Sequence, residues 1–429
     1  MPVQIPRRLR TKAIGIAGLS VGALAVAAVF NAAQGANPPV APASPTAAAI
    51  ATVPGMPPVI DPHNLYSETT ATKIGAALQG DLERVYVPNL RGNDVSVIDP
   101  AKLKVVDKFK VGKGPQHIVP SWDLRTLWVA NNAERSTAGS LTPIDPRTGK
   151  PGTAIPVEDP YNLYFTPDGK SAIVVAEAMH RLDFRDPKTL KLQYAIDVPQ
   201  CGGINHADFS IDGRYAIFTC EFQGSVAKID LVDRKVLGYL KLTLPKTRFK
   251  DIELPPGIPD TEVCSAAKGM PQDIRISPDG KKFYVADMEA DGVHVLDGDA
   301  FKEIGFIATG VAAHGLYPSR DGKRLYVANR GWHKIHGGKH GKGGVTVVDF
   351  ATEKIVAQWP VPGGGSPDMG NVTADGKYLW LSGRFDDVVY RIDTTSGEYK
   401  IIAVGMEPHG LTVWPQPGRY SLGHTGNLR

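Results

Sequence analysis

Residues 270–296, MPQDIRISPDGKKFYVADMEADGVHVL, contain the unit whose repetition decides the fold of this 429-residue chain. Ile274 and Ile276 alternate with polar residues, and the following Ser-Pro-Asp-Gly sequence, residues 277–280, is typical of a tight turn. An apolar run resumes at Phe283, and a second turn separates it from the segment VHVL. Apolar residues at every second position predict strands rather than a helix. The stretch therefore reads as strand, turn, strand, loop and strand.

The same unit recurs at intervals of about 40 to 50 residues, which is the spacing typical of propeller blades. Copies of the turn and second strand are WDLRTLWVANN from Trp122, PDGKSAIVVAE from Pro167, IDGRYAIFTCE from Ile211, PDGKKFYVADM from Pro278, RDGKRLYVANR from Arg320 and ADGKYLWLSGR from Ala374. Copies of the third strand begin at Asp94, Gly139, Gly224, Gly292, Gly343 and Asp387, with a degenerate copy, HRLDF, at His180. An alternating fourth strand follows each third strand. The pattern predicts an all-β protein, a seven-bladed β-propeller of four-stranded antiparallel blades.

The two ends of the repeat region predict how the ring closes. Residues 409–415 have the pattern of a first strand, whereas the N-terminal repeat begins at Arg84 with a second strand. We therefore expect N- and C-terminal strands to complete one blade together. Residues 73–79 and 419–424 also resemble strands, so an incomplete eighth blade is the alternative.

The segments LYVAN, FYVAD and VYVPN, followed by VSVID and VTVVD, resemble the YVTN repeats of YncE-like periplasmic propellers from Leu82 to Arg429. This resemblance implies a fold but no single function, because such propellers include scaffolds, binding proteins and enzymes. More distantly, the repeats are similar to the haem-binding propellers of nitrite reductases and to seven-bladed lactonases. The sequence has no CxxCH motif, so any haem would be bound non-covalently.

Residues 1–36 are typical of an export signal, because basic residues between Arg7 and Lys12 precede an uncharged run over residues 13–30. We expect a periplasmic or extracellular protein, with membrane attachment only if this segment stays uncleaved. Residues 37–72 are predicted to form a Pro- and Ala-rich linker, and residues 73–429 the propeller.

The charge balance argues against nucleic-acid binding. Without the four basic residues of the export signal, 44 basic and 44 acidic side chains remain. A neutral domain lacks the cationic surface that non-specific nucleic-acid binding requires. We expect a monomer whose partner is a small molecule or a protein.

Polar residues recur at one face of the predicted disc, which we call the top face. Because neighbouring strands are antiparallel, this face carries the starts of the first strands and the ends of the second strands, and the Asp-Gly turns lie on the opposite, bottom face. The candidate ligand-binding residues at the starts of first strands are Gln116, His117, Asn162, Asn205, His206, Gln272, Asp273, His314, Asp368 and His409. The ends of second strands add Asn329, Arg330 and Arg384.

Two kinds of chemistry suit this ring. Four histidines in equivalent positions are candidate ligands for a transition metal or a non-covalent haem: His117, His206, His314 and His409. Glu177 and Glu221 end the second strands of consecutive blades and are the candidate catalytic residues. Polar residues that only solvate the channel are the alternative to both.

Two insertions and the cysteines complete the predicted face. The segment RGWHKIHGGKHGKGG, residues 330–344, carries His333, His336 and His340 and predicts either a solvated loop or a second metal-binding tract. The Pro-rich residues 243–269 predict a lid. Cys201 and Cys264 both precede first strands of neighbouring blades, so we expect a disulfide between them and a buried free thiol at Cys220. A metal site formed by a cysteine with His206 is the alternative.

Taken together, the sequence favours an exported, non-catalytic propeller that binds a ligand or protein partner at the top face. The alternatives are a metal- or haem-dependent oxidoreductase-like protein and a lactonase-like hydrolase. No P-loop, serine-nucleophile or dinucleotide-binding motif stands in a strand-to-helix setting.

Overall fold

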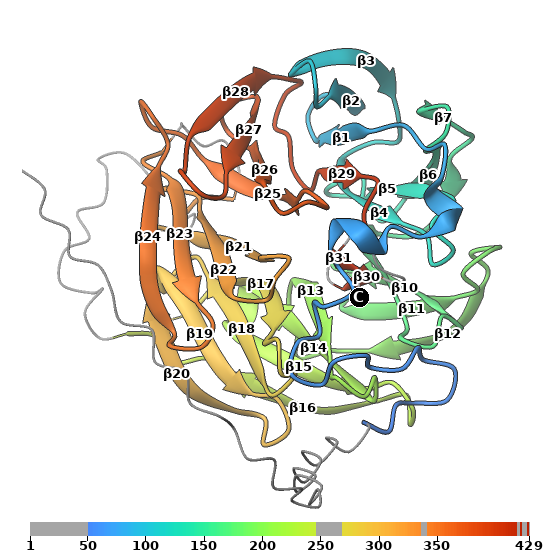
Figure 1. The fold of residues 1–429 in the computed structure, drawn as a ribbon. Helices are drawn as coiled ribbons and strands as arrows, with labels where there is room; N and C mark the ends of the chain where they lie inside the picture. Colours follow the sequence, from blue (N-terminus) through green and yellow to red (C-terminus); the bar gives the residue numbers. More distant parts are fainter. Residues whose placement is uncertain (1–49, 246–267, 336–340, 418–420, 423–426, 429) are drawn as a thin grey trace, which may run out of the picture. The chain divides into compact units, whose positions relative to one another are not determined.

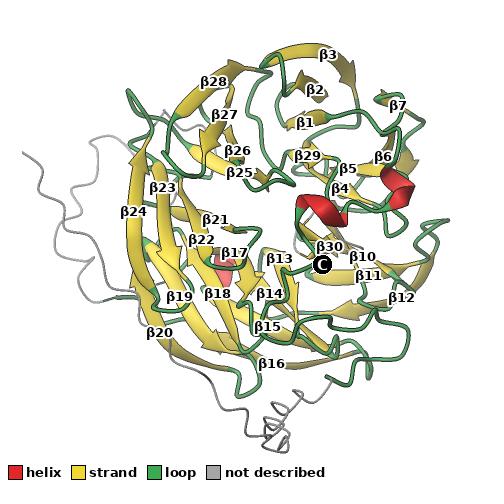
Figure 2. Ribbon diagram, in the orientation of Figure 1, coloured by secondary structure: helices red, strands yellow, loops and turns green. Residues whose placement is uncertain are grey.

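The computed structural model describes residues 50–245, 268–335, 341–417, 421–422 and 427–428. Their strands form seven antiparallel sheets around a central axis (Figure 1), which confirms the predicted β-propeller. Helical structure in this part of the chain is limited to short 3-10 turns (Figure 2), namely η1 (Ala71–Lys73), η2 (Ala76–Leu78) and η3 (Glu221–Gln223). None of the described helices is long and apolar enough to cross a membrane.

The blades are named A to G in chain order, and the strands of each blade run from the inner to the outer edge in the order stated. Blade A contains β29 (Thr412–Trp414), β1 (Arg84–Asn89), β2 (Asp94–Asp99) and β3 (Lys104–Lys110). Blade B contains β4 (Pro115–Pro120), β5 (Leu127–Asn131), β6 (Ser140–Asp145) and an outer strand divided into β7 (Lys150–Pro151) and β8 (Ile155–Pro156). Blade C contains β9 (Pro160–Phe165), β10 (Ala172–Ala176), β11 (Arg181–Arg185) and β12 (Leu192–Asp197). Blade D contains β13 (Ile204–Phe209), β14 (Tyr215–Cys220), β15 (Ser225–Asp230) and β16 (Lys235–Lys241).

The remaining three blades have the same order. Blade E contains β17 (Pro271–Ile276), β18 (Lys282–Asp287), β19 (Gly292–Asp297) and β20 (Lys302–Ala308). Blade F contains β21 (Ala313–Pro318), β22 (Arg324–Asn329), β23 (Gly344–Asp349) and β24 (Lys354–Pro360). Blade G contains β25 (Pro367–Val372), β26 (Tyr378–Gly383), β27 (Val388–Asp393) and β28 (Tyr399–Ala403).

Blade A closes the ring, as the ends of the repeat region predicted. The C-terminal strand β29 pairs antiparallel with β1, and Val413 lies opposite Val85. The eighth-blade alternative is wrong for the described residues, because η1 and η2 occupy residues 71–78. Strands β30 (Ser421–Leu422) and β31 (Asn427–Leu428) form a hairpin that is not hydrogen-bonded to any blade in the described part of the chain.

The apolar core lies between neighbouring blades. The inner strand β13 is buried along its whole length, whereas the outer strand β16 alternates between exposed and partly buried residues. Tyr164 of blade C packs with its ring against Phe209 and Phe218 of blade D, with centroids 6.2 and 6.1 Å apart. Because inner strands are covered on both faces, they keep the top-face residues in fixed positions.

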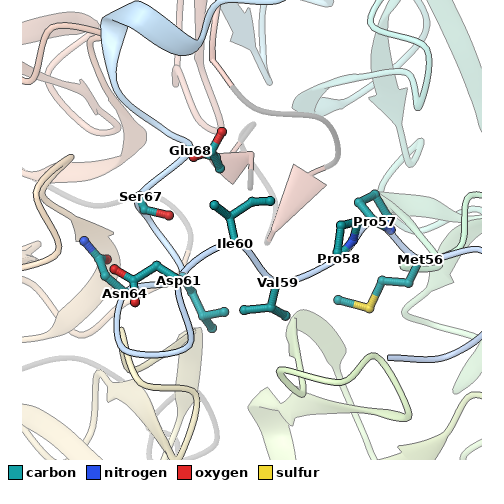
Figure 3. A pocket seen from close by; sticks show the side chains of 10 residues that line it. Met56, Pro57, Pro58, Val59, Ile60, Asp61, Asn64, Ser67 and Glu68 are labelled. Carbon is teal, nitrogen blue, oxygen red and sulfur yellow. The ribbon is translucent and has the colours of Figure 1, made fainter. Parts of the chain in front are cut away.

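The described part of the predicted linker, residues 50–72, lies against the bottom face (Figure 1). The amide of Val53 donates to the carbonyl of Asp212 at 2.9 Å, and that of Leu65 to Pro278 at 2.8 Å, so both contacts reach Asp-Gly turns. Tyr66 is buried and its hydroxyl donates to the Ile276 carbonyl at 2.7 Å. A small cavity of about 40 Å³ lies along residues 56–68 and is too small for an organic ligand. Figure 3 shows the side chains that line it.

Candidate functional site

A β-bulge interrupts the inner strand of blades B to G near the top face, where the repeat alignment placed the candidate ring. In blade B, Pro115 lies opposite Asn131 and His117 opposite Ala130, so Gln116 has no partner in β5. The pairing omits Asn205 and His206 in blade D and Gln272 and Asp273 in blade E in the same way. A bulge changes the direction of unpaired side chains relative to the regular alternation. The same local irregularity therefore sets the site residues of successive blades.

The mouth of the channel contains a cavity of about 470 Å³. This volume lies within the range of about 300 to 1,000 Å³ that is usual for small-molecule sites. The residues predicted from the sequence that line it are Gln116, Glu177, Glu221, Gln272, His314, Arg330 and Arg384. Blades B to G all contribute to its wall.

One side of the wall, from blades C and D, is acidic. Glu177 follows β10, and Glu221 follows β14 and accepts hydrogen bonds from the neutral amides of Asn205 at 3.0 Å and Gln272 at 2.9 Å. Neither glutamate pairs with a cation among the described residues, whereas Glu134 pairs with Arg91 at 3.2 Å. Burial, and next the charge of Glu221, raise the pKa of Glu177 well above its usual value, and burial also raises the pKa of Glu221.

Across the mouth, the wall from blades F and G carries two arginines. Arg330 follows β22 and donates through Nη2 and Nε to Asp368 Oδ1, at 2.8 and 3.2 Å. Arg384 donates through Nη2 to Glu407 Oε1 at 3.3 Å, and its Nη1 lies 3.8 Å from Asp368 Oδ2. Burial opposes the charge of Asp368, but Arg330 and the nearby histidines hold its pKa well below the usual value. The basic side is therefore ion-paired within the protein, whereas Arg330 and Arg384 act on Glu221 only without a direct contact.

The four candidate histidines lie close to the axis, and three of them pack ring against ring. The His117 ring lies 4.7 Å from that of His409 and 5.2 Å from that of His206. Gly410 permits this packing, because a Cβ atom there would overlap the imidazole of His117. His314 lies on the far side of His409, with ring centroids 6.2 Å apart.

His314, Asp368 and His409 are the described residues best placed to hold a metal, since one ligand atom from each lies within 4.8 Å of the others. The charge around these residues nevertheless does not suit a cation. Asp368 Oδ2 and both ring nitrogens of His409 have no hydrogen-bond partner among the described residues. However, Arg330 Nη2 donates to His314 Nε2 and to Asp368 Oδ1, and Arg384 Nη1 lies 3.8 Å from Asp368 Oδ2, so two guanidinium ions would repel a bound cation. Burial and then Arg330 lower the pKa of His314 to about 4, which keeps its ring neutral beside that guanidinium.

A non-covalent haem also does not fit this arrangement. Axial ligation requires a histidine nitrogen lone pair that faces the cavity. Of the four candidate histidines, only His314 lines the cavity, and its Nε2 accepts a hydrogen bond from Arg330.

Other predicted ring residues join neighbouring strands beneath the cavity. Asp273 accepts from the Leu316 amide at 2.9 Å and pairs with Arg275 at 2.8 Å. Asn162 Nδ2 contacts His206 Nδ1 at 3.2 Å. These residues are buried and link inner strands of adjacent blades or stiffen one blade, so they support the ring.

Asn329 lies away from the cavity. Its amide donates to Thr346 Oγ1 at 2.9 Å and to the Val327 carbonyl at 3.1 Å, which fastens β22 to β23. Asn131 makes the equivalent bond to Thr142 Oγ1 at 3.0 Å in blade B. The asparagine that ends this repeat motif is therefore a contact within the blade.

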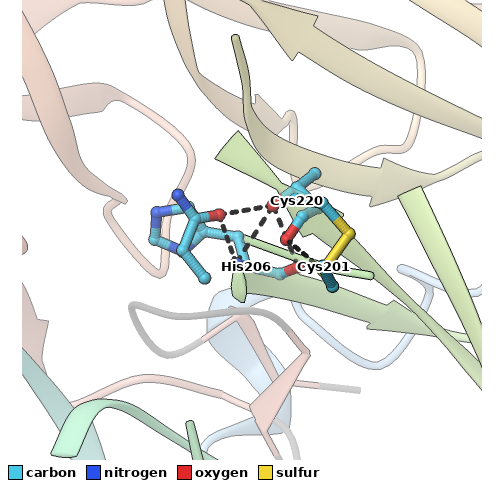
Figure 4. The surroundings of a disulfide bond; sticks show 5 residues. Cys201, His206 and Cys220 are labelled. Carbon is cyan, nitrogen blue, oxygen red and sulfur yellow. Dashed lines mark hydrogen bonds between the residues drawn. A yellow bond between two sulfur atoms is a disulfide. The ribbon is translucent and has the colours of Figure 1, made fainter. Parts of the chain in front are cut away.

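The predicted disulfide between Cys201 and Cys264 is wrong. Cys201 is bonded to Cys220, with Cα atoms 4.8 Å apart, beside His206 (Figure 4). Cys201 precedes β13 and Cys220 ends β14, and these strand ends meet because the two strands are antiparallel neighbours. The wrong prediction paired two cysteines that precede first strands of neighbouring blades. Cys264 itself lies outside the described residues. The bond adjoins Glu221 and holds the end of β14.

The two insertions at the mouth are described only in part. His333 Nε2 lies 2.8 Å from Asp291 Oδ1, whereas His336 and His340 lie outside the described residues. Most of the predicted lid, residues 246–267, also lies outside them. At the base of the histidine-rich insertion, Ile335 lines the cavity.

Tyr161 lies at the predicted ring position next to Asn162 but is not among the candidate ligand-binding residues, although it is the bulge residue of blade C and shares its register with Gln116. Tyr161 is 7% exposed and lines the cavity, with its ring 5.2 Å from that of His117. Asp159 and Phe222 also line the cavity from connecting segments, where no repeat signal could have indicated them.

Seven four-stranded blades around a polar channel mouth define a seven-bladed β-propeller. Residues 39–187 and 261–417 match the YNCE-like beta-propeller family, and the chain belongs to that family. No curated protein matches the sequence significantly.

Solved structures share the fold at low sequence identity. Hydrazine synthase from Kuenenia stuttgartiensis is 19% identical, with 69% of this chain and 88% of that chain covered and a TM-score of 0.52. A proposed 6-phosphogluconolactonase from Bacteroides uniformis is 17% identical, with 77% and 99% covered and a TM-score of 0.57. A functionally unknown protein from Desulfotomaculum acetoxidans is 14% identical, with 77% and 98% covered and a TM-score of 0.57. At these identities the similarity concerns the fold alone.

Proposed function

We propose that this chain is an exported β-propeller that binds a small polar organic molecule at the mouth of its channel without transforming it. The observation that carries the proposal is the cavity of about 470 Å³, whose wall combines ionisable groups of both signs from blades C, D, F and G. Its volume suits a small molecule.

Two further features support the ligand-binding role. Gln116, Gln272 and His314 stand on bulges of buried inner strands, so their positions are fixed before a ligand arrives, which lowers the entropic cost of binding. Gln116 is 3% exposed, and its Oε1 has no hydrogen-bond partner among the described residues. Such a buried acceptor costs free energy unless a ligand or water donates to it.

Export is supported by the N-terminal sequence and by the cysteines. A basic segment and an uncharged apolar run precede the propeller. The Cys201–Cys220 disulfide suits an oxidising compartment.

The proposal is tested by a thermal-shift screen of polar metabolites with two matched variants. Ala178 is exposed and lines the cavity, so Ala178→Trp should obstruct it, whereas Ala300→Trp places the same side chain on an exposed turn elsewhere. A ligand at 100 times its Kd stabilises the folded state by about 2.7 kcal/mol. We expect compounds that raise the Tm of the wild type and of Ala300→Trp but not of Ala178→Trp. Equal shifts in both variants, or no shift in the wild type with any compound, would reject the site.

A lactonase-like hydrolase is the second candidate, because the pKa of Glu177 is raised beside a second carboxyl group in the same cavity. Such a pair can supply a general acid and a general base. Lactone turnover by the wild type that is lost in Glu177→Gln, with lactone binding retained, would favour this candidate over simple binding.

A further inference from the structure

We infer that the ligand of this cavity is a small amine, bound as an ammonium ion with a single positive charge and carrying an oxygen acceptor at its other end. The inference deepens the proposed function and rests on it. In the bound state the ammonium group contacts Glu177 and Glu221, and the acceptor faces Arg330 and Arg384.

The acidic side forms no ion pair within the described part of the chain. The carboxylate of Glu221, which is 3% exposed, accepts only from neutral amides, and Glu177 is partly exposed. The charges of Arg330 and Arg384 favour ionised Glu221, but neither guanidinium is bonded to it. The carboxylate of Asp159, on the same side, accepts only from the backbone amides of Ala178 and Met179 among the described residues. Buried carboxylates are usually paired, because their desolvation is unfavourable. An ammonium ion between Glu177 and Glu221 supplies this missing charge.

Two neutral groups on the same part of the wall also suit an ammonium ion. Tyr161 is more than nine-tenths buried, lines the cavity, and its hydroxyl makes no hydrogen bond to a described residue. Gln116 is 3% exposed and its Oε1 is equally without a donor there. An ammonium group has three N–H donors and no acceptor, so it matches carboxylate, phenol and amide oxygens together. The ring of Phe222, on the rim of the cavity, adds a surface that attracts cations.

The opposite wall limits the ligand to one positive charge. Arg330 is fully buried and Arg384 nearly so, and both line the cavity while they pair with Asp368 and Glu407. A second ammonium group there would meet two guanidinium ions, whereas a carboxylate or hydroxyl oxygen could accept from them. Arg135, exposed at the rim, places a further positive charge at the entrance.

Binding should be coupled to proton release. Burial raises the pKa of both Glu177 and Glu221, which disfavours their ionised forms when no cation is present. An ammonium ion stabilises the ionised carboxylates and lowers their pKa, so a proton held by either group is released on binding. Calorimetric titration in two buffers of different ionisation enthalpy measures the number of protons released.

Four probes with the same six-carbon chain test separately whether binding needs the ammonium group, the oxygen acceptor and a single positive charge: 6-aminohexanoate, hexylamine, hexanoate and 1,6-diaminohexane. We expect 6-aminohexanoate to bind most tightly, hexylamine next, and the other two at least tenfold more weakly than hexylamine, with proton release for the two monoamines. Glu177→Gln and Glu221→Gln should each weaken monoamine binding at least tenfold. Glu398→Gln, an exposed glutamate on a turn of blade G, is the matched control and should change nothing. If Glu221→Gln fails to fold, Glu177→Gln carries the test, because Glu177 is partly exposed.

Hexanoate that binds as tightly as hexylamine, or monoamine binding that survives both glutamine variants, would overturn the inference. The failure of the inference is distinguishable from that of the proposed function. If none of the four probes binds but another compound does and is blocked by Ala178→Trp, the ammonium assignment is wrong and the binding site stands. If no compound is blocked by Ala178→Trp, both are wrong.

Discussion

Removal of the Cys201–Cys220 disulfide should destabilise the propeller by an amount that follows from the length of the loop it closes. The two cysteines are 19 residues apart in the sequence. The chain-entropy relation for a loop of that length gives about 3 kcal/mol at 25 °C. We therefore expect Cys201→Ala combined with Cys220→Ala to lower the free energy of unfolding by about 3 kcal/mol in urea titrations. Cys264→Ala is the control and should leave that free energy unchanged.

A peptide map under non-reducing conditions identifies the bond directly. A peptide linking Cys201 to Cys264, or a loss of stability only in the Cys264→Ala variant, would refute the assignment. The double variant should also weaken binding at the mouth, because Cys220 directly precedes Glu221 and the bond holds the end of β14. Wild-type affinity in a destabilised double variant would show that the disulfide has no part in positioning Glu221.

Two further predictions concern buried charges. Burial opposes the charge on His294, but hydrogen bonds to Asp287 and Glu303 raise its pKa to about 9. This folded-state pKa lies above the unfolded value of about 6.5, so the stabilisation is complete below pH 6.5 and is lost as the pH rises through 9. In urea titrations between pH 6 and pH 10, the free energy of unfolding should therefore fall by up to about 3 kcal/mol more for the wild type than for His294→Gln. A stability difference that stays constant over this range would contradict the prediction. Replacing Arg330 by Gln should remove the guanidinium from His314 Nε2 and Asp368 Oδ1. Zn²⁺ should therefore raise the Tm of Arg330→Gln and leave the Tm of the wild type unchanged. Equal Tm shifts in the two proteins would show that the guanidinium does not compete with a metal.

The sequence was sufficient to predict the blades because the turn and the third strand repeat as local signals. The Asp-Gly turn and the alternating strands lie within a few residues of each other, so neither depends on distant contacts. The top-face ring followed from the same register, since an equivalent repeat position lies at an equivalent place around the axis. Gln116, Gln272 and His314 come from three different blades and line one cavity, which agrees with that reasoning.

What could not be predicted depends on contacts between segments that the repeat does not relate. The disulfide required knowing which strand ends meet at the top of blade D. The packing of residues 50–72 depends on a few buried side chains, such as Met56 and Tyr66, within a Pro- and Ala-rich composition that is typical of linkers. The ion pair between Asp368 and Arg330 depends on the directions of two side chains from different blades, and the alignment of repeats does not give these directions.

The architecture explains how the mouth can hold carboxylates that have no internal cation. Side chains of the inner strands bind the backbone of the next blade: Asp208 accepts from Ile276, Asp273 from Leu316, and Asn371 from Val413, each at 2.9 Å. These bonds run from blade D to E, from E to F and from G to A, so a shift of one inner strand would break a bond to its neighbour. Buried polar groups without partners cost about 1 to 3 kcal/mol each, and a less constrained mouth would relax by turning them toward solvent. The ring prevents that relaxation, so the carboxyl groups of Glu177 and Glu221, which form no ion pair with a described residue, stay at the cavity wall, where a cationic ligand can bind them.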